Sequence, residues 1–461
     1  MMQSFIPFLE ITLLLVIGGT ALALLLLPRA TMTLAIALGL PLGTFLNALI
    51  FFDYTVLGIP LTQFSIFAGH LLSLGVLILL IYKRPTLLMD LERPEKTMNP
   101  PRERIEKIVI AGALVLITMT IVYSVIHALI LPTTQYDSLT NWTMRSRISY
   151  EDQRMAFDPT EDRGMAKPQY PFLFHALQIT ANQGQPEWND TAANGILYLL
   201  SLSTFCALFL MIRKLRGTAQ ALFAIAAVLS IPLISIHTAQ GYADLNLLQY
   251  VALSLVCLGM WVESNHERKN RWLVLSGVFV AASVWTKSEG LVFGLLPWLV
   301  VIALLCGIGK DAKKTALPAV LVALALAAPW PVFAWLQELS LTPHSSDTML
   351  QFHSEAIREA LLAVFGRGSF GVTWYALLIL VPTLIVASIK KHPGVACRQA
   401  PLLFWGILMT AEILFIYLCT PNVRFLLNAE SFYRQMMIPA AMLILACSMC
   451  VVFPSWGIRK D

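Results

Sequence analysis

The stretch IVIAGALVLITMTIVYSVIHALILPTTQYD, residues 108–137, contains the two features that decide the fold. Its first part, 108–131, has no Asp, Glu, Lys or Arg and is longer than the roughly 20 apolar residues that a helix needs to cross the hydrocarbon layer of a membrane. Its end, Tyr136-Asp137, is an aromatic–acidic pair placed directly after the apolar run. The stretch therefore predicts a transmembrane helix followed by a polar group at the membrane surface.

Similar apolar blocks recur along the whole chain, which is 57% hydrophobic and only 13% charged, with a mean hydropathy of +0.71. A water-soluble fold has no means of burying so much apolar sequence in continuous blocks. We predict an all-α, polytopic transmembrane helix bundle of about 13 helices. The expected spans are 5–27, 31–51, 63–82, 108–131, 191–212, 218–237, 242–262, 271–286, 289–307, 315–336, 371–389, 401–419 and 434–455.

The distribution of Lys and Arg predicts the orientation of the bundle. Basic residues gather between alternate spans, at 83–107, 213–216, 268–271, 310–314 and 390–398, and basic loops stay on the cytoplasmic side. The N-terminus is then outside and the C-terminus inside. The first block has no basic residue before it and no clear cleavage site after it, so we read it as a retained helix. This bias explains the net charge of +5 and gives no indication of a nucleic-acid partner.

The motifs do not indicate a metal-binding or a nucleotide-binding protein. The seven cysteines lie mostly inside apolar blocks and lack metal-ligand spacing, and the chain has no Gly-rich nucleotide-binding motif.

The outer loop 131–190 is far longer than a connection requires, and loops of this length are usually functional. Two short helices are expected in it, at 138–150 and from Pro171 to about Asn182. Both are expected to lie on the membrane surface, with Arg145 and Arg147 facing lipid headgroups or water. The Pro-rich linker at 83–107 separates an N-terminal three-helix unit from the rest of the chain. We therefore expect three parts: the three-helix unit with its linker at 1–107, a catalytic module with the outer loop at 108–336, and the C-terminal helices and outer loops at 337–461.

Asp137 is the first candidate for chemistry, because its carboxylate starts the first loop helix at the membrane surface. That position suits a general base. It equally suits a helix N-cap, a role that Asp fills well, and position alone does not separate the two readings.

The pattern resembles the GT-C glycosyltransferases, the membrane enzymes that include protein O-mannosyltransferases and the aminoarabinose transferases of lipid A. The resemblance rests on Tyr136-Asp137 after a helix, on the turn Lys167-Pro-Gln-Tyr-Pro171 in a long outer loop, and on two later acidic loops. It covers about 108–336 and leaves 1–107 as an added unit. It implies an essential Asp in the first outer loop, matched by Asp137, and a polyprenyl-phosphate sugar as the donor.

Two later segments match where the family places polar residues facing its cavity. Gly241-Tyr-Ala-Asp244 lies at the outer end of a helix, and Trp285-Thr-Lys287-Ser-Glu289-Gly290 forms the outer turn of a helix pair. Asp244 is a second catalytic candidate, with a helix cap as its alternative. Lys287 is expected to neutralise a lipid phosphate, and the adjacent Glu289 is expected to orient the Lys287 ammonium. The alternative for Lys287 is a lysine that snorkels to the membrane surface.

Further site residues follow from the charge that grows on a departing phosphate, which cations stabilise. The phosphate-binding candidates are Lys287, Glu289, Arg424, Arg434 and Lys167, with headgroup contact as the alternative for the two arginines. The candidates in the substrate loop are Tyr136, Tyr170 and His175, although a lone His on a partly apolar helix is more often structural.

We therefore predict an integral glycosyltransferase of a bacterial inner membrane that faces the periplasm. It transfers a hexose or pentose from a polyprenyl-phosphate donor to a lipid, glycan or protein acceptor, with Asp137 as base. A divalent metal ion held by Asp137 and Asp244 remains open. The alternatives are a transporter or flippase of lipid-linked sugars, whose polar groups lie nearer the bilayer midplane, and a polymerase or ligase of lipid-linked polysaccharide.

Overall fold

The computed structural model describes residues 2–27, 30–83, 104–157, 169–238, 240–263, 270–308, 312–339, 350–392, 395 and 397–451. Over these ranges the chain is helical, and the extended structure is limited to one isolated bridge between Val395 and Val451. The expectation of an all-α membrane bundle is confirmed.

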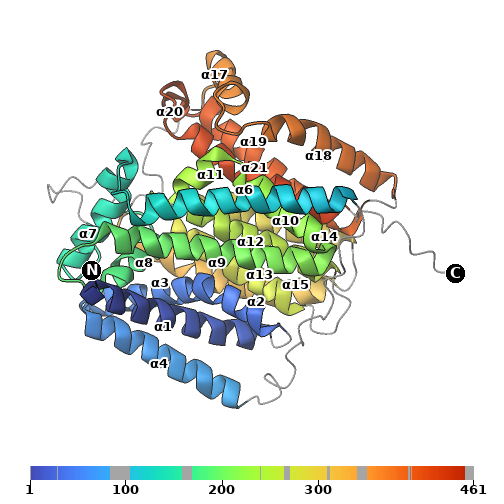
Figure 1. Ribbon diagram of the computed structural model, residues 1–461. Helices are drawn as coiled ribbons and strands as arrows, with labels where there is room; N and C mark the ends of the chain where they lie inside the picture. The colour runs from blue at the N-terminus through green and yellow to red at the C-terminus, as the bar shows by residue number, and fades with distance from the viewer. Residues whose placement is uncertain are drawn as a thin grey trace.

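Long apolar helices run side by side and make up most of the molecule (Figure 1). Every block predicted to cross the membrane contains helix. The main helices are α1 (Met2–Leu26), α3 (Gly39–Leu57), α4 (Gln63–Tyr82), α6 (Arg104–Leu129), α9 (Asp190–Arg216), α10 (Thr218–Leu229), α12 (Ala243–Glu263), α13 (Asn270–Thr286), α14 (Leu296–Ile308), α15 (Ala312–Ala327), α18 (Thr373–Ile389), α19 (Leu403–Cys419) and α21 (Phe432–Cys450).

Among the described residues, 10 helical segments are long and apolar enough to span a membrane. Helices α10, α13 and α18, of 12, 17 and 17 residues, are not among these segments. The structure therefore supports a multi-pass protein, and a count of 13 crossings stays a prediction.

Helix α12 forms the centre of the bundle, since 94% of its most apolar window is buried, against 11% for α6. It packs against α9, α13 and α21. Helix α6 instead exposes Leu114, Val115 and Met119 on its outer face. Apolar side chains exposed in this way need a lipid environment, as expected of a helix at the edge of a membrane bundle.

The outer loop folds into a short π-helix η1 (Ser138–Trp142) that continues into α7 (Thr143–Glu151), followed by α8 (Leu173–Asn182). Both expected loop helices are present. These elements gather at one end of the bundle, at the left of Figure 1, which we call the loop end.

The environment of these loop helices differs from the expectation in two places. All ten residues of α8 are buried, because α8 packs among α1, α3, α7 and α9 instead of lying on a membrane surface. Arg145 is fully buried: its Nε donates to the carbonyl of Ala156 (2.9 Å) and its Nη1 to that of Tyr170 (2.5 Å). Only Arg147 faces outward as expected, paired with Glu151.

The N-terminal helices contact this loop directly. The Asn47 side-chain oxygen on α3 lies 2.9 Å from His70 Nε2 on α4 and accepts a hydrogen bond from Thr180 on α8 (3.1 Å). All three residues are buried. Helices α3 and α4 thus hold the outer-loop helix α8 in place through a buried polar network.

Smaller elements complete the loop end. They are α11 (Pro232–His237), η2 (Gly290–Leu295), α16 (Pro329–Leu336), η3 (Ser354–Ala356), α17 (Ile357–Leu361), η4 (Leu362–Gly366) and α20 (Val423–Leu427), together with α2 (Met32–Ala37) and η5 (Cys397–Leu402) toward the opposite end. Helices α17 and α20 contact each other and project from the bundle at the top of Figure 1.

Candidate active site

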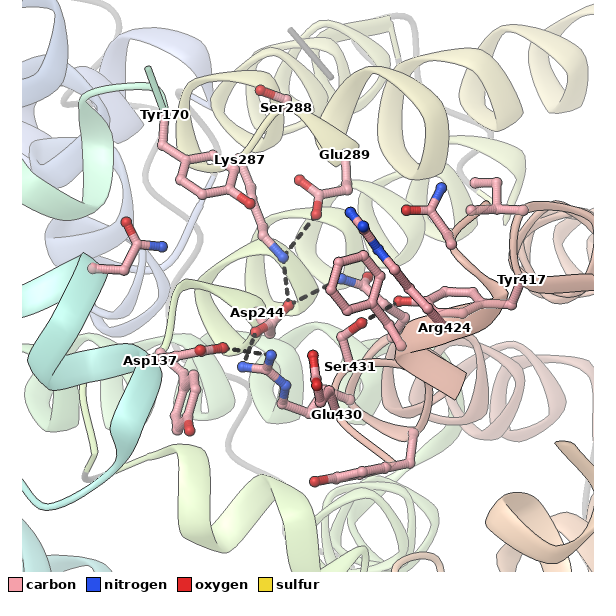
Figure 2. A pocket seen from close by; sticks show the side chains of 18 of the residues that line it. Asp137, Tyr170, Asp244, Lys287, Ser288, Glu289, Tyr417, Arg424, Glu430 and Ser431 are labelled. Atoms are coloured by element: carbon pink, nitrogen blue, oxygen red, sulfur yellow. Dashed lines mark hydrogen bonds and ion pairs between the residues drawn. The ribbon is translucent and has the colours of Figure 1, made fainter. Parts of the chain in front are cut away.

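A cavity of about 1080 Å³ opens at the loop end. Four segments form most of its wall: the start of the outer loop, the first turn of α12 with Tyr242 before it, the turn between α13 and η2, and the α19–α21 connection. Tyr170 and Leu350 complete the lining. Its charged residues are Asp137, Asp244, Lys287, Glu289, Arg424, Glu430 and Arg434. All of them except Arg434 are labelled in Figure 2.

Asp137 occupies the N-cap position of η1, but its side chain makes no capping hydrogen bond. Its Oδ2 instead lies 2.5 Å from Nη2 of Arg434, at the start of α21. The carboxylate is partly exposed toward the cavity, with 36% of the side chain accessible. The contacts of Asp137 are therefore those of an ion pair and not those of a helix cap.

Asp244 lies in the first turn of α12 and is almost fully buried. The tight turn before it depends on Gly241, which has φ +68°; a Cβ there would come within 2.5 Å of the Ser138 hydroxyl. Because the turn packs so closely on η1, it brings Asp244 into the same cavity as Asp137. The Asp244 Oδ1 then accepts hydrogen bonds from Lys287 Nζ (2.9 Å) and Gln435 Nε2 (3.3 Å).

Lys287 lies between two carboxylates in the turn after α13. Its Nζ is 2.9 Å from Asp244 Oδ1 and 2.8 Å from Glu289 Oε1 (Figure 2). Burial lowers the pKa of this ammonium, but Asp244 and Glu289 together raise the pKa well above its usual value. Lys287 therefore stays charged across the physiological pH range, and its contacts are those of an ion-pair network and not of a snorkelling lysine.

The sharpness of this turn comes from Gly290, where a Cβ would lie 2.1 Å from the carbonyl oxygen of Ser283. Only glycine allows so close an approach of the two backbone segments. The turn directs Lys287 and Glu289 toward the cavity.

Arg434 links the two aspartates. Besides its contact with Asp137, its Nη1 lies 3.6 Å from Asp244 Oδ2. Its guanidinium also lies over the ring of Tyr242, 5.0 Å from the centroid, and the other ring partner of Tyr242 is His237 at 4.4 Å. The result is a continuous chain of charges: Glu289, Lys287, Asp244, Arg434, Asp137.

The remaining predicted site residues fall into three groups. Tyr136, Tyr170 and Arg424 line the cavity, with Tyr136 highly exposed and Tyr170 buried. His175 does not line it: the fully buried ring stacks on Trp142, and its Nδ1 lies 2.9 Å from the Ser146 hydroxyl. Lys167 lies outside the described residues.

The sequence argument missed several polar residues that line the cavity, namely Asn141, Tyr417, Glu430 and Gln435. Gln435 offered a signal, because a polar residue inside an apolar span needs a partner. The other three carry no distinguishing sequence pattern and reach the cavity only through tertiary packing.

A shared metal ion does not fit the arrangement of the two aspartates. Within the described ranges, no group of three or more His, Cys, Asp and Glu side chains is arranged to hold a metal ion. The guanidinium of Arg434 takes the position between Asp137 and Asp244 that such an ion needs.

The expected resemblance to the GT-C fold is confirmed by comparison with known proteins. The sequence model of the dolichyl-phosphate-mannose-protein mannosyltransferase family matches residues 183–335. That segment contains Asp244, Lys287 and Glu289. No curated protein sequence matches the chain.

Two crystal structures of ArnT from Cupriavidus metallidurans share the fold. The apo form has a TM-score of 0.53 at 14% identity over 73% of this chain, and the form bound to undecaprenyl phosphate has 0.51 at 16% identity over 74%. In both comparisons the match spans 59% of the ArnT chain. The likeness establishes the architecture of the bundle.

Proposed function

We propose that this protein is a membrane glycosyltransferase that moves a sugar from a polyprenyl-phosphate donor to an acceptor at the outer, periplasmic face of a bacterial inner membrane. The observation that carries the proposal is the pairing of Asp137 with Arg434 inside the cavity. It places a carboxylate that can accept a proton beside a cation that can bind a phosphate.

The reaction uses these two groups in complementary ways. An acceptor hydroxyl or amine attacks the anomeric carbon, the bond from that carbon to the phosphate oxygen breaks, and the polyprenyl phosphate leaves with the negative charge. Asp137 takes the proton of the acceptor. Arg434 and Arg424 stabilise the charge on the departing phosphate.

Lys287 supports the phosphate side of the site less directly. Two carboxylates already neutralise its ammonium, so its first effect is to hold Asp244 and Glu289 in place. The network then orients Arg434 through Asp244. This gives Asp244 a positioning role and Asp137 the role of base.

The comparisons support the donor class. The matching family is named for a dolichyl-phosphate-linked sugar donor, and ArnT of the same fold binds undecaprenyl phosphate. A polyprenyl phosphate is the element common to both. The sugar and the acceptor of this chain do not follow from either name.

The placement of the charges argues against the rival transporter function. The ion pairs Asp137–Arg434 and Lys287–Asp244 lie at the loop end, where helices begin or end, whereas a transport pathway needs polar groups near the middle of the bilayer. A polysaccharide polymerase or ligase remains the nearest rival, and its acceptor would be a lipid-linked glycan.

The decisive experiment measures transfer of radiolabelled sugar from a panel of polyprenyl-phosphate sugars by the full-length protein in membranes. Asp137→Asn keeps the size of the side chain but removes the base, so we expect transfer to fall by a factor of about 10² to 10⁴. Glu151→Gln, at an exposed carboxylate of the same loop, is the matched control and should retain activity.

Full activity of Asp137→Asn would refute the assignment of the base. Absence of both transfer and donor hydrolysis in the wild type, together with passage of labelled lipid across the bilayer, would establish the transporter instead.

A further inference from the structure

Several hydrogen-bond acceptors in the cavity wall have no partner among the described residues. They are Glu289 Oε2, Gln435 Oε1 and Asn141 Oδ1. All three residues line the cavity, and Gln435 and Asn141 are more than nine-tenths buried. An unsatisfied buried acceptor costs about 1–3 kcal/mol, so three of them in one wall need an explanation.

The orientation of the Gln435 amide is fixed by chemistry. Its nitrogen donates to Asp244 Oδ1 at 3.3 Å. A carboxylate oxygen only accepts hydrogen bonds, so turning the amide over would place two acceptors against each other. The unpartnered Oε1 is therefore a true acceptor and not an uncertain assignment of the two amide atoms.

Glu289 leads to the same conclusion. One oxygen of its carboxylate pairs with Lys287 Nζ at 2.8 Å, and the other, Oε2, is buried without a donor. A phosphate cannot satisfy it, because both groups are negatively charged acceptors. The missing group must donate a hydrogen bond.

Beside these acceptors lies an aromatic pair. The rings of Trp142 and Tyr170 stack with centroids 4.5 Å apart, and Lys287 Nζ lies 5.9 Å from each. Both rings line the cavity next to Asn141. Aromatic side chains combine large apolar contact area with little conformational freedom to lose on binding.

We propose that Glu289, Gln435 and Asn141 form a subsite that accepts hydrogen bonds from the hydroxyl groups of the transferred sugar, with Trp142 and Tyr170 as its apolar wall. The inference rests on the proposed function and adds the class of sugar. Three acceptors without donors favour a neutral, polyhydroxylated sugar, because its hydroxyl groups donate hydrogen bonds, and disfavour a sugar that carries a carboxylate, which only accepts them.

A double-mutant cycle, in which one change is made in the protein and the other in the donor sugar, tests the subsite. The probes are bare undecaprenyl phosphate, undecaprenyl phosphate carrying glucose, mannose, galactose or arabinose, the matching uronic acids, and the monodeoxy forms of the best neutral donor. Binding and transfer are measured for the wild type and for Gln435→Leu in lipid nanodiscs.

We expect Gln435→Leu to bind bare undecaprenyl phosphate within about twofold of the wild type, which also shows that it folds. Its KM for the sugar donor should rise about tenfold, the size of one lost hydrogen bond. One monodeoxy donor should lose about tenfold with the wild type and nothing further with Gln435→Leu, the non-additivity of a direct contact.

Gln399→Leu is the matched control. Gln399 is a buried glutamine in η5 whose Nε2 donates to Glu263 (3.1 Å) and whose Oε1 also lacks a partner, but it does not line the cavity. Asp244 begins α12 and Glu263 ends it, so this second glutamine lies at the other end of the bundle. Its substitution should leave the KM for every donor unchanged.

Three outcomes would overturn the inference. If the losses from Gln435→Leu and from each monodeoxy donor simply add, Gln435 contacts no hydroxyl of the sugar. If a uronic acid is transferred as efficiently as the neutral sugar, the subsite does not select neutral sugars. If the wild type neither binds undecaprenyl phosphate nor transfers any sugar, the proposed function fails together with the subsite. If the wild type transfers sugar but the losses in the cycle are additive, the subsite is refuted and the proposed function stands.

Discussion

Lys287 Nζ and Asp244 Oδ1 lie 2.9 Å apart in the wall of the cavity, although the two residues are 43 positions apart in the chain. Both side chains are buried, at 7% and 1% exposed. A buried ion pair gains little over an apolar pair of the same shape, but removal of one partner leaves a buried charge less well compensated. Among the described residues, Lys287 then keeps only Glu289, and Asp244 keeps only Arg434, as its ionic partner. The ion pair therefore couples the stability of the turn after α13 to that of the first turn of α12.

Breaking this pair should destabilise the fold. We expect Asp244→Asn and Lys287→Met each to lower the free energy of unfolding by about 2 kcal/mol, the size of one hydrogen bond to a charged group, because a buried charge loses one of its two ionic partners. The double variant should lose less than the sum of the two. Thermal unfolding in detergent provides the measurement, and additive losses would contradict the coupling.

Arg434 should not be replaceable by lysine. The planar guanidinium contacts Asp137 and Asp244 at once, whereas an ammonium is a single point charge. We expect Arg434→Lys to reduce kcat by a factor of about 10². Arg367→Lys, in an ion pair with Glu359 that does not line the cavity, should leave kcat unchanged; equal loss in both variants would argue against a specific role.

His175 should make the protein sensitive to acid. Burial and the nearby Arg145 hold the pKa of its imidazole well below the usual 6.5. The unfolded chain binds a proton below that pH and the folded chain does not, so stability is complete above about pH 6.5. It falls by up to about 1.4 kcal/mol per pH unit as the pH is lowered.

His175→Asn keeps a polar group facing the Ser146 hydroxyl and removes the titration. Thermal midpoints between pH 4.5 and 7.5 should therefore fall less in this variant than in the wild type. Parallel curves for the two proteins would mean that another group causes the acid loss.

Chelation of divalent metals should leave transfer intact. Arg434 occupies the position between Asp137 and Asp244 and supplies the positive charge that a metal ion would otherwise supply. We therefore expect EDTA to change the rate of sugar transfer by less than about twofold. Loss of activity in EDTA and its restoration by Mg²⁺ or Mn²⁺ would show that Arg434 moves aside for a metal ion.

The outer loop shows where local sequence patterns succeed and fail. The helical spacing at 138–150 and the prolines before 173 identified both loop helices, because helix formation depends on neighbouring residues. The same patterns placed Arg145 at a membrane surface, whereas it lies fully buried with two backbone carbonyls as partners. Burial depends on what packs over a helix, and the helix alone does not contain that information.

The candidate site divides in the same way. Asp137 was proposed from its position after an apolar block, and Asp244, Lys287 and Glu289 from the resemblance to GT-C enzymes. Arg424 and Arg434 were proposed because cations stabilise a departing phosphate. All six residues line the cavity. The partners of these residues were not identified. Nothing in the local pattern links Asp137 to Arg434, or sets Gln435 against Asp244.

An all-α membrane bundle with a long loop at one end follows from the sequence, since the length of an apolar block and the position of a charge are local quantities. The packing of the helices is needed to show that α12, α13, α21 and the outer loop bring their ends to one cavity. The packing also pairs five charges of alternating sign from these segments in one chain. The physical reason is that ion pairing and burial depend on distances between segments far apart in the chain, which are set by how whole helices pack.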